Sequence, residues 1–168
     1  MTRVFQISLP VTCSFFVAIL LTACSAVQRI SDSHTQHEQR PFKPPVHAHF
    51  PTQDGGLIYG DLYGVGERGV VLAHGGRFNK ESWEKQAQAL ATAGFRVLAI
   101  DFRGYGESRG PGQQDVFTAP LHLDVLAGVQ YLRKTGAKTV FAMGGSMGGA
   151  AAAQATIREP GQIDRLAR

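Results

Sequence analysis

The sequence is poor in cysteine and in charged residues, and each shortage excludes a class of protein. Two cysteines in 168 residues are too few for a small secreted scaffold held together by disulfide bonds. Charged residues make up 18% and hydrophobic residues 43% of the chain, a balance that excludes a disordered protein. The formal net charge is +4, but no run of five or more lysines and arginines occurs, so no nucleic-acid binding is predicted. One globular domain of ordinary size is expected.

Residues 1–24 have the layout of a secretory signal peptide rather than of folded structure. Arg3 supplies a short positive region, an apolar stretch follows that is richest over residues 15–21, and small residues lead to Cys24. The alternative is an uncleaved signal anchor, because residues 4–23 are nearly long enough to span a bilayer. The strongest apolar block is too short for a membrane-spanning helix, which favours the signal peptide.

The end of this segment, Leu21-Thr22-Ala23-Cys24, resembles the lipobox of bacterial lipoproteins. The resemblance implies cleavage before Cys24, a diacylglycerol on its thiol and an acyl chain on its new amine. Several acyl chains on one residue are sufficient for stable membrane anchoring. A lipid-anchored protein of the bacterial cell envelope is therefore expected, at the outer membrane or the periplasmic face.

Residues 25–49 are polar and contain four histidines and three prolines, a composition typical of a linker. The histidines are His34, His37, His47 and His49. A metal site is the alternative, but the histidines have no cysteine or carboxylate partners at ligand spacing, which favours a solvated linker. The folded domain is expected to occupy residues 50–168.

Alternating apolar runs and amphipathic segments predict the fold class of this domain. Strands are expected at 57–63, 69–73, 95–100 and 139–143, and helices after Asn79 as N-cap, after Pro120 and from Gly148. Unbroken apolar runs are typical of strands that are buried on both faces. The predicted class is therefore α/β, with a mostly parallel sheet covered by helices on both faces.

The pentapeptide 144–148 fits the pattern G-x-S-x-G and lies between a predicted buried strand and a predicted helix. A sharp strand-to-helix turn brings the flanking positions against the strand and the helix, so glycine is needed there, and the turn exposes the hydroxyl of Ser146. A chance match is the alternative, because 20 of the 168 residues are glycine. Ser146 is the candidate nucleophile.

A second motif, His74-Gly75-Gly76, follows another predicted buried strand. Backbone N–H groups at this place and after the nucleophile form an oxyanion hole in hydrolases that use such a turn. The N–H of Gly76, or of Arg77 one residue later, could pair with the N–H of Met147. Each such donor contributes about 3 kcal/mol to transition-state stabilisation. His74 is expected to order this loop without taking part in proton transfer.

Patterns that hold cofactors and metals are missing. The glycine-rich turn at residues 101–108 would need a further glycine at position 109 to match a dinucleotide-binding loop, and Arg109 stands there. The phosphate-binding pattern G-x-x-x-x-G-K does not occur, and no cluster of histidine, cysteine and aspartate has metal-ligand spacing. No cofactor and no metal are expected.

Three motifs in this order and spacing, at residues 74–76, 101–108 and 144–149, resemble the α/β-hydrolase superfamily. The nearest groups are the dienelactone-hydrolase-like proteins and the serine-aminopeptidase or monoacylglycerol-lipase-like branch. The likeness covers residues 55–165 and implies an eight-stranded, mostly parallel sheet.

The resemblance also implies roles for single residues. Ser146 is the implied nucleophile, and the N–H groups of Gly76 and Met147 form the implied oxyanion hole. The implied reaction is hydrolysis of a small-molecule ester, thioester or amide through an acyl-enzyme, without a cofactor. Asp101 and Arg103 are carried over as structural residues that hold their loop.

The chain departs from this family after Ser146. In the superfamily the nucleophile is followed by Asp or Glu and then by His, whereas here the last histidine is His122 and only Glu159 and Asp164 supply later carboxylates. Residues 163–167 resemble the start of a sixth strand, so a chain truncated after the nucleophile helix, and inactive alone, is expected. His122 as a substitute base is one alternative. A non-catalytic envelope lipoprotein or gene remnant is another.

Overall fold

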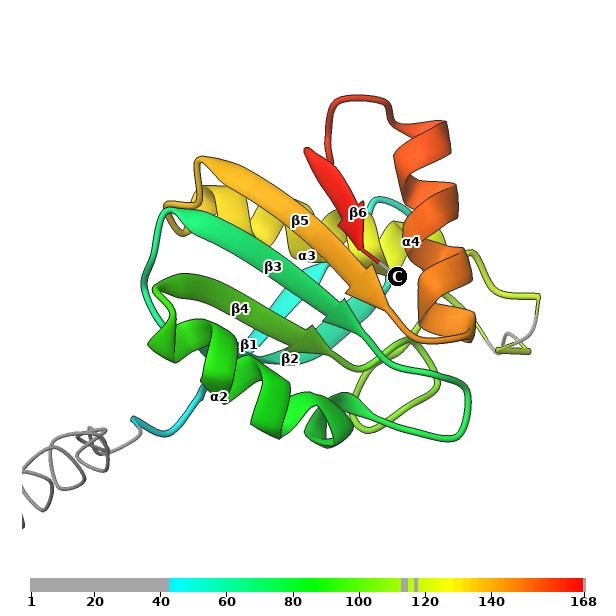
Figure 1. Ribbon diagram of the computed structural model, residues 1–168. Coiled ribbons are helices and arrows are strands. Elements are labelled where there is room, and N and C mark those ends of the chain that lie inside the picture. Colours follow the sequence, from blue (N-terminus) through cyan, green and yellow to red (C-terminus); the bar gives the residue numbers. More distant parts are fainter. Residues whose placement is uncertain (1–42, 113–114, 117, 168) are drawn as a thin grey trace, which may run out of the picture. The chain divides into compact units, whose positions relative to one another are not determined.

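The computed structural model describes residues 43–112, 115–116 and 118–167 (Figure 1). The predicted signal peptide, its lipidation site Cys24 and most of the predicted linker lie outside these residues. In the described ranges, no helix is long and apolar enough to cross a membrane.

The described strands form one mixed sheet in the spatial order β1-β2-β4-β3-β5-β6. They are β1 (Val46–Pro51), β2 (Leu57–Tyr63), β3 (Arg68–Ala73), β4 (Phe95–Ile100), β5 (Thr139–Gly144) and β6 (Arg165–Ala167). The β1–β2 and β2–β4 pairs are antiparallel, whereas β4, β3, β5 and β6 are parallel neighbours. The predicted α/β class with a mostly parallel sheet is confirmed, and so are the four predicted strands.

Helices cover both faces of this sheet (Figure 1). They are the 3-10 helix η2 (Lys80–Trp83), α2 (Glu84–Thr92), α3 (Leu121–Lys134) and α4 (Met147–Arg158). Successive residues of β3 serve the two layers, because side chains alternate between the faces of a strand. Val71 belongs to the apolar cluster that includes α3 and α4, and Leu72 belongs to the cluster that includes Ala87 of α2. Burial on both faces explains why the central strands are unbroken apolar runs.

The first helix begins differently from its prediction. Asn79 precedes η2 as expected, but its side chain forms no capping hydrogen bond. The N–H of Lys80 instead donates to Asp101 Oδ1 at 2.8 Å, and Asp101 directly follows β4. The partner comes from another strand, so spacing along the chain could not reveal it. Gly94 and Gly136 follow α2 and α3 with positive φ, as glycines at helix ends commonly do.

The domain begins earlier than the predicted boundary at residue 50, and the predicted linker 25–49 was wrong over its last residues. Strand β1 starts at Val46 and pairs with β2, burying Ala48 and Phe50 while His47 and His49 face outward. His47 Nδ1 lies 2.6 Å from Asp61 Oδ1 on the neighbouring strand. The sheet therefore holds these two histidines. Within the described residues, no group of three or more His, Cys, Asp or Glu could hold a metal ion.

The predicted start of a strand at residues 163–167 is confirmed as β6, which pairs with β5 from Phe141 to Met143. Asp164 prepares this pairing, because its Oδ2 accepts the N–H of Val140 at 2.7 Å and lies 3.1 Å from Arg133 Nη2. The edge of β5 is thus partly covered in the described structure.

Candidate functional site

Ser146 occupies the turn between β5 and α4 in an unusual backbone conformation. Its φ is 52° and its ψ is −115°, and among the described residues it is the one non-glycine residue with a positive φ. Such a conformation costs about 1–3 kcal/mol and persists where the surrounding structure holds it. The strain singles out this residue as a functional candidate.

The glycines around Ser146 explain how the turn is held. A Cβ on Gly144 would lie 2.3 Å from the carbonyl carbon of Gly148, and a Cβ on Gly148 would lie 2.2 Å from the carbonyl oxygen of Ala73. Neither position has room for a side chain, which confirms the steric reason given for the motif. A Cβ on Gly145 would meet nothing within 4 Å. The two tight glycines thus let β5 and α4 approach closely on either side of the serine.

Two backbone N–H groups beside this turn have no partner within the described part of the chain. Met147 opens α4, where the first N–H groups of a helix have no intrahelical acceptor. The N–H of Gly76 also donates to no described group. The loop of Gly76 lies against the turn, because a Cβ on Gly76 would be 3.6 Å from Met147 Sδ. The structure thus brings the predicted oxyanion-hole residues Gly76 and Met147 close together next to Ser146.

His74 fixes the direction of the Gly76 amide. The Gly75 carbonyl accepts hydrogen bonds from His74 Nδ1 at 2.8 Å and from the N–H of Phe78 at 3.0 Å. In a trans peptide the C=O and the following N–H point in opposite directions, so anchoring the Gly75 carbonyl also aims the Gly76 N–H. This loop geometry is set before any substrate binds.

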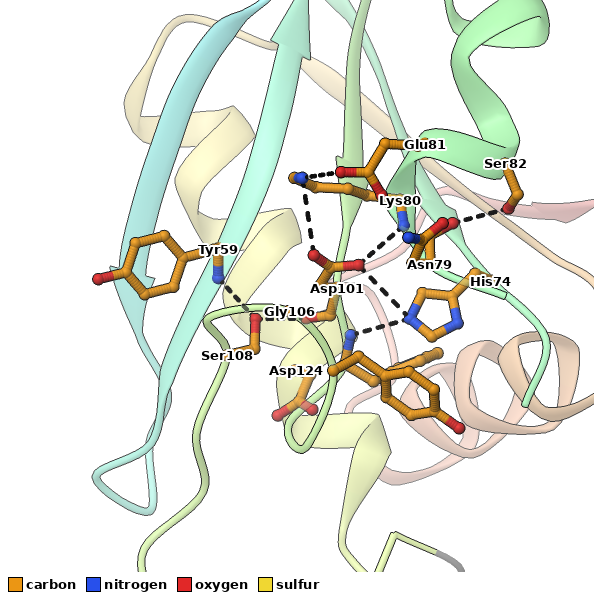
Figure 2. A network of polar contacts seen from close by, with 12 residues as sticks. Tyr59, His74, Asn79, Lys80, Glu81, Ser82, Asp101, Gly106, Ser108 and Asp124 are labelled. Carbon is orange, nitrogen blue, oxygen red and sulfur yellow. Dashed lines mark hydrogen bonds and ion pairs between the residues drawn. The ribbon is translucent and has the colours of Figure 1, made fainter. Parts of the chain in front are cut away.

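Both ring nitrogens of His74 are occupied (Figure 2). The N–H of Phe102 donates to Nε2 at 3.2 Å, which leaves the proton on Nδ1 for the Gly75 carbonyl. His74 is fully buried, and this burial lowers its pKa from the ordinary histidine value. A neutral imidazole with both nitrogens engaged orders the loop, as the sequence analysis expected, and is not placed to accept the proton of Ser146.

Tyr105 was not singled out by the sequence analysis, yet its hydroxyl donates to the Gly76 carbonyl at 2.6 Å. Its ring also packs edge-on against His74, with centroids 4.6 Å apart. Tyr105 therefore holds the carbonyl side of Gly76, while His74 holds the amide side through Gly75. The only sequence signal was an aromatic residue inside the glycine-rich turn after β4.

Asp101 and Lys80 close the other end of the same loop (Figure 2). Besides accepting the Lys80 N–H, Asp101 lies with Oδ2 3.7 Å from Lys80 Nζ, and the ammonium also contacts Asp61 and Glu81. Burial raises the pKa of the Asp101 carboxyl, which these contacts oppose. Asp101 thus has the structural role that the resemblance implied.

Arg103 joins three segments of the chain in a buried cluster. Its guanidinium binds Asp124 of α3, with Nε 2.8 Å and Nη2 2.6 Å from Oδ1, and binds Asp54 with Nη1 2.6 Å from Oδ2. The hydrogen bond from Arg103 lowers the pKa of Asp54 to about 2, whereas burial raises that of Asp124. Arg103 therefore holds the turn after β4, as implied, and makes no contact with Ser146.

Within the described residues, no side chain forms a hydrogen bond with the Ser146 hydroxyl. His122 lies in the first turn of α3 with its Nδ1 buried and without a partner. Glu159 follows the last residue of α4, at the opposite end of the helix from Ser146, and Asp164 is bound to Val140. The described part of the chain brings the nucleophile and the amides together but places no acid or base beside them.

A hollow of about 310 Å³ adjoins the serine, and Gly75, Gly145 and Ser146 line it. His122 is not among its lining residues. A substrate carbonyl seated over Ser146 would have this hollow as its neighbour.

Known proteins resemble most of this domain. A family model for the alpha/beta hydrolase fold matches residues 69–167. The chain is 33% identical over 135 residues to bifunctional epoxide hydrolase 2 of Sus scrofa, covering 79% of this chain and 22% of that protein. It is 35% identical over 109 residues to the pimeloyl-[acyl-carrier protein] methyl ester esterase of Serratia marcescens, covering 65% of this chain and 38% of the esterase.

Solved structures agree with these relatives. An esterase of Pyrococcus furiosus superposes with a TM-score of 0.64 and 25% identity, covering 73% of this chain and 47% of the esterase. An epoxide hydrolase from an endophytic Streptomyces gives a TM-score of 0.63 and 32% identity, covering 74% of this chain and 36% of that enzyme. In each case this chain spans less than half the length of the protein it matches.

Proposed function

This chain belongs to the α/β-hydrolase family, and from that premise we propose that Ser146 is the nucleophile of a serine hydrolase that acts on carboxylic esters, thioesters or amides. The observation that carries the proposal is the strained Ser146 backbone beside two N–H groups without partners. Strain of this kind gathers at active sites, and unpaired amides at a helix start suit a developing negative charge.

The proposed reaction runs through an acyl-enzyme. A base takes the Ser146 proton as Oγ bonds to the substrate carbonyl carbon, and the carbonyl oxygen becomes an oxyanion. The N–H groups of Gly76 and Met147 donate to this oxygen, each contributing about 3 kcal/mol to the transition state. The tetrahedral intermediate expels the leaving group, which takes up the proton. Water then cleaves the acyl ester on Ser146 and restores the hydroxyl.

The side chain at the turn favours acyl transfer over epoxide opening, although some relatives are named epoxide hydrolases. Attack of a serine oxygen on a carbonyl group gives an ester, which water can cleave in the second step. Attack of the same oxygen on an epoxide carbon would give an ether, which water does not cleave, so the enzyme would stop after one turnover. A serine at this place therefore supports an ester, thioester or amide as the substrate.

The proton acceptor comes from outside the described residues in this proposal. His74 is neutral with both nitrogens engaged, and His122 does not line the hollow beside Ser146. A serine hydroxyl without a base is a weak nucleophile near neutral pH. In a comparable triad, loss of the histidine costs about 10⁶-fold in kcat. We therefore expect the 168-residue chain alone to be a very poor catalyst.

We also propose that Cys24 carries the lipid that holds the domain at the membrane of the bacterial cell envelope. The support is the motif Leu21-Thr22-Ala23-Cys24 at the end of an apolar segment. The hydrolase domain would then meet its small-molecule substrate from a membrane-anchored position, which requires two or more acyl chains for stable attachment.

The proposed function is tested by p-nitrophenyl acetate and mass spectrometry. After incubation with a separately supplied segment that carries the family's Asp and His, the acetyl group is expected on Ser146 and p-nitrophenolate release is expected to need that residue. The matched controls are Ser146→Ala with the segment and the chain without the segment. A Ser146→Ala variant that releases p-nitrophenolate as fast as the parent chain would contradict the proposal and favour a non-catalytic lipoprotein.

A further inference from the structure

The hollow beside Ser146, called here the Ser146 pocket, has residues that suggest what it binds. Besides Gly75, Gly145 and Ser146, it is lined by Phe78, Ser82, Trp83 and Gln86. Phe78, Ser82 and Gln86 are exposed and form its rim, and Trp83 is half-buried. No lysine, arginine, aspartate or glutamate lines it.

We propose that the Ser146 pocket binds one uncharged, apolar group of the substrate, of about the size of a phenyl ring with a short link, and that Phe78, Trp83 and Gly145 determine this specificity. The inference deepens the proposed function, on which it rests, by naming the class of substrate. It concerns binding, so it can be tested without turnover.

The lining excludes a charged group. An ionised carboxylate or ammonium that leaves water needs a partner of opposite charge or several hydrogen bonds. The pocket offers no charged side chain, and the Ser82 hydroxyl already donates to the Asn79 carbonyl at 2.7 Å. Two aromatic side chains, Phe78 and Trp83, instead offer apolar surface and ring faces. An apolar aromatic or branched aliphatic group satisfies this lining.

The volume limits the size of that group. About 310 Å³ lies at the lower end of the range for small-molecule sites, roughly 300–1,000 Å³. At about 30 Å³ for each water-sized atom, the pocket holds about ten non-hydrogen atoms. A phenylacetyl or benzyl group meets this limit, and a long acyl chain exceeds it.

Gly145 keeps the pocket open. A Cβ at this position would meet no atom within 4 Å, and its backbone is not in the left-handed region. A larger residue could therefore be accommodated without backbone strain, and its side chain would occupy space next to Ser146. Gly144 and Gly148, in contrast, are required by the close approach of the backbone.

The test uses Trp83, which is the only tryptophan of the chain and therefore the only source of indole fluorescence. The full chain is titrated with phenylacetamide, phenylacetate and benzylammonium, three ligands of similar size that differ in charge. We expect a saturable change in Trp83 emission with phenylacetamide and at least tenfold weaker binding of the two ions. No saturable change with phenylacetamide, or binding of either ion within threefold of phenylacetamide, would overturn the proposal.

Variants localise the binding. Gly145→Leu is expected to weaken phenylacetamide binding at least tenfold, and Phe78→Ala at least threefold. Val65→Leu adds the same side chain on a turn whose residue is 83% exposed and is expected to change nothing. Circular dichroism checks folding, and if Gly145→Leu does not fold, Phe78→Ala still decides the question. Unchanged binding in both pocket variants would contradict the proposal.

A Ser146→Ala variant separates this inference from the proposed function. It is expected to bind phenylacetamide with the affinity of the parent chain, because the pocket does not depend on the hydroxyl. If charge discrimination persists but Ser146 never acquires an acyl group, the nucleophile assignment fails and the pocket remains. If Ser146 is acylated but the three ligands bind alike, the pocket proposal alone is wrong.

Discussion

A methyl group on Gly144 would lie 2.3 Å from the carbonyl carbon of Gly148, so β5 and α4 are in backbone contact on the two sides of Ser146. This contact fixes the serine between two segments that cannot separate without moving the sheet or the helix. It also explains how a residue with a φ of 52° is retained, because the surrounding backbone leaves no relaxed position for it.

The first prediction compares two neighbouring glycines. Gly144→Ala is expected to lower the free energy of unfolding by about 1–3 kcal/mol, since the added methyl overlaps backbone atoms that cannot yield easily. Gly145→Ala is the matched control and is expected to leave stability unchanged or raise it by up to about 1 kcal/mol, because its position is open. Urea unfolding measures both. Equal losses in the two variants would show that the backbone contact is not the cause.

Sequence patterns predicted the central elements well and the polar contacts between elements poorly. The strands around residues 70, 98 and 141 are buried on both faces, so their apolar runs were visible without the fold. The steric need for glycine around Ser146 also follows from a local turn. These features depend on residues that are close in the chain.

Other features depend on partners far apart in the chain. Strand β1 alternates over only a few residues between prolines and histidines, so its polar face resembled a linker until its pairing with β2 was seen. The bond from Lys80 to Asp101 and the bond from Tyr105 to Gly76 cross between loops that only the folded sheet brings together. Such contacts leave no spacing for a sequence reading to detect.

The second prediction concerns the role of Tyr105 as a positioning residue. Tyr105→Phe removes the hydrogen bond to the Gly76 carbonyl, a loss of about 1 kcal/mol, and is expected to slow modification of Ser146 by a fluorophosphonate about fivefold. The rate is measured with added imidazole as external base. Tyr131→Phe is the control, because the structure assigns its hydroxyl no described partner. Equal rates in Tyr105→Phe and the parent chain would contradict the positioning role, provided that both are folded.

The third prediction uses the buried Nδ1 of His122. Burial, with the positive charges of Arg158 and Arg103, lowers the pKa of His122. The folded state therefore binds fewer protons than the unfolded state, so stability from this residue is present above about pH 6.5 and is lost as the pH falls below it. His122→Leu is expected to remove this loss, so its advantage in unfolding free energy grows from pH 8 to pH 5.

Urea unfolding at several pH values measures this difference, in which the contribution of His74 cancels because both proteins contain it. Parallel pH profiles would show that the surroundings of His122 are polar in solution. The same variant tests the alternative base, because His122→Leu is expected to leave the imidazole-assisted modification of Ser146 unchanged. A loss of that reaction would assign the base to His122.

The fourth prediction concerns the membrane anchor. Labelled palmitate is expected to enter the parent chain when it is produced in a bacterium that processes lipoproteins, and Cys24→Ser is expected to abolish the label. Cys13→Ser is the matched control, because Cys13 would be removed with the signal peptide. Release of the parent chain from membranes without detergent would contradict lipid anchoring.

The most direct measurement is the rate of fluorophosphonate modification of Ser146 as imidazole is added to the 168-residue chain. The oxyanion-hole amides and the strained serine are in place, and the described residues supply no base. The account therefore predicts little reaction without imidazole, a rate that rises with the concentration of neutral imidazole, and a single adduct that maps to Ser146 and disappears in Ser146→Ala. Adducts spread over other serines, or a rate that does not respond to imidazole or to Ser146→Ala, would contradict it.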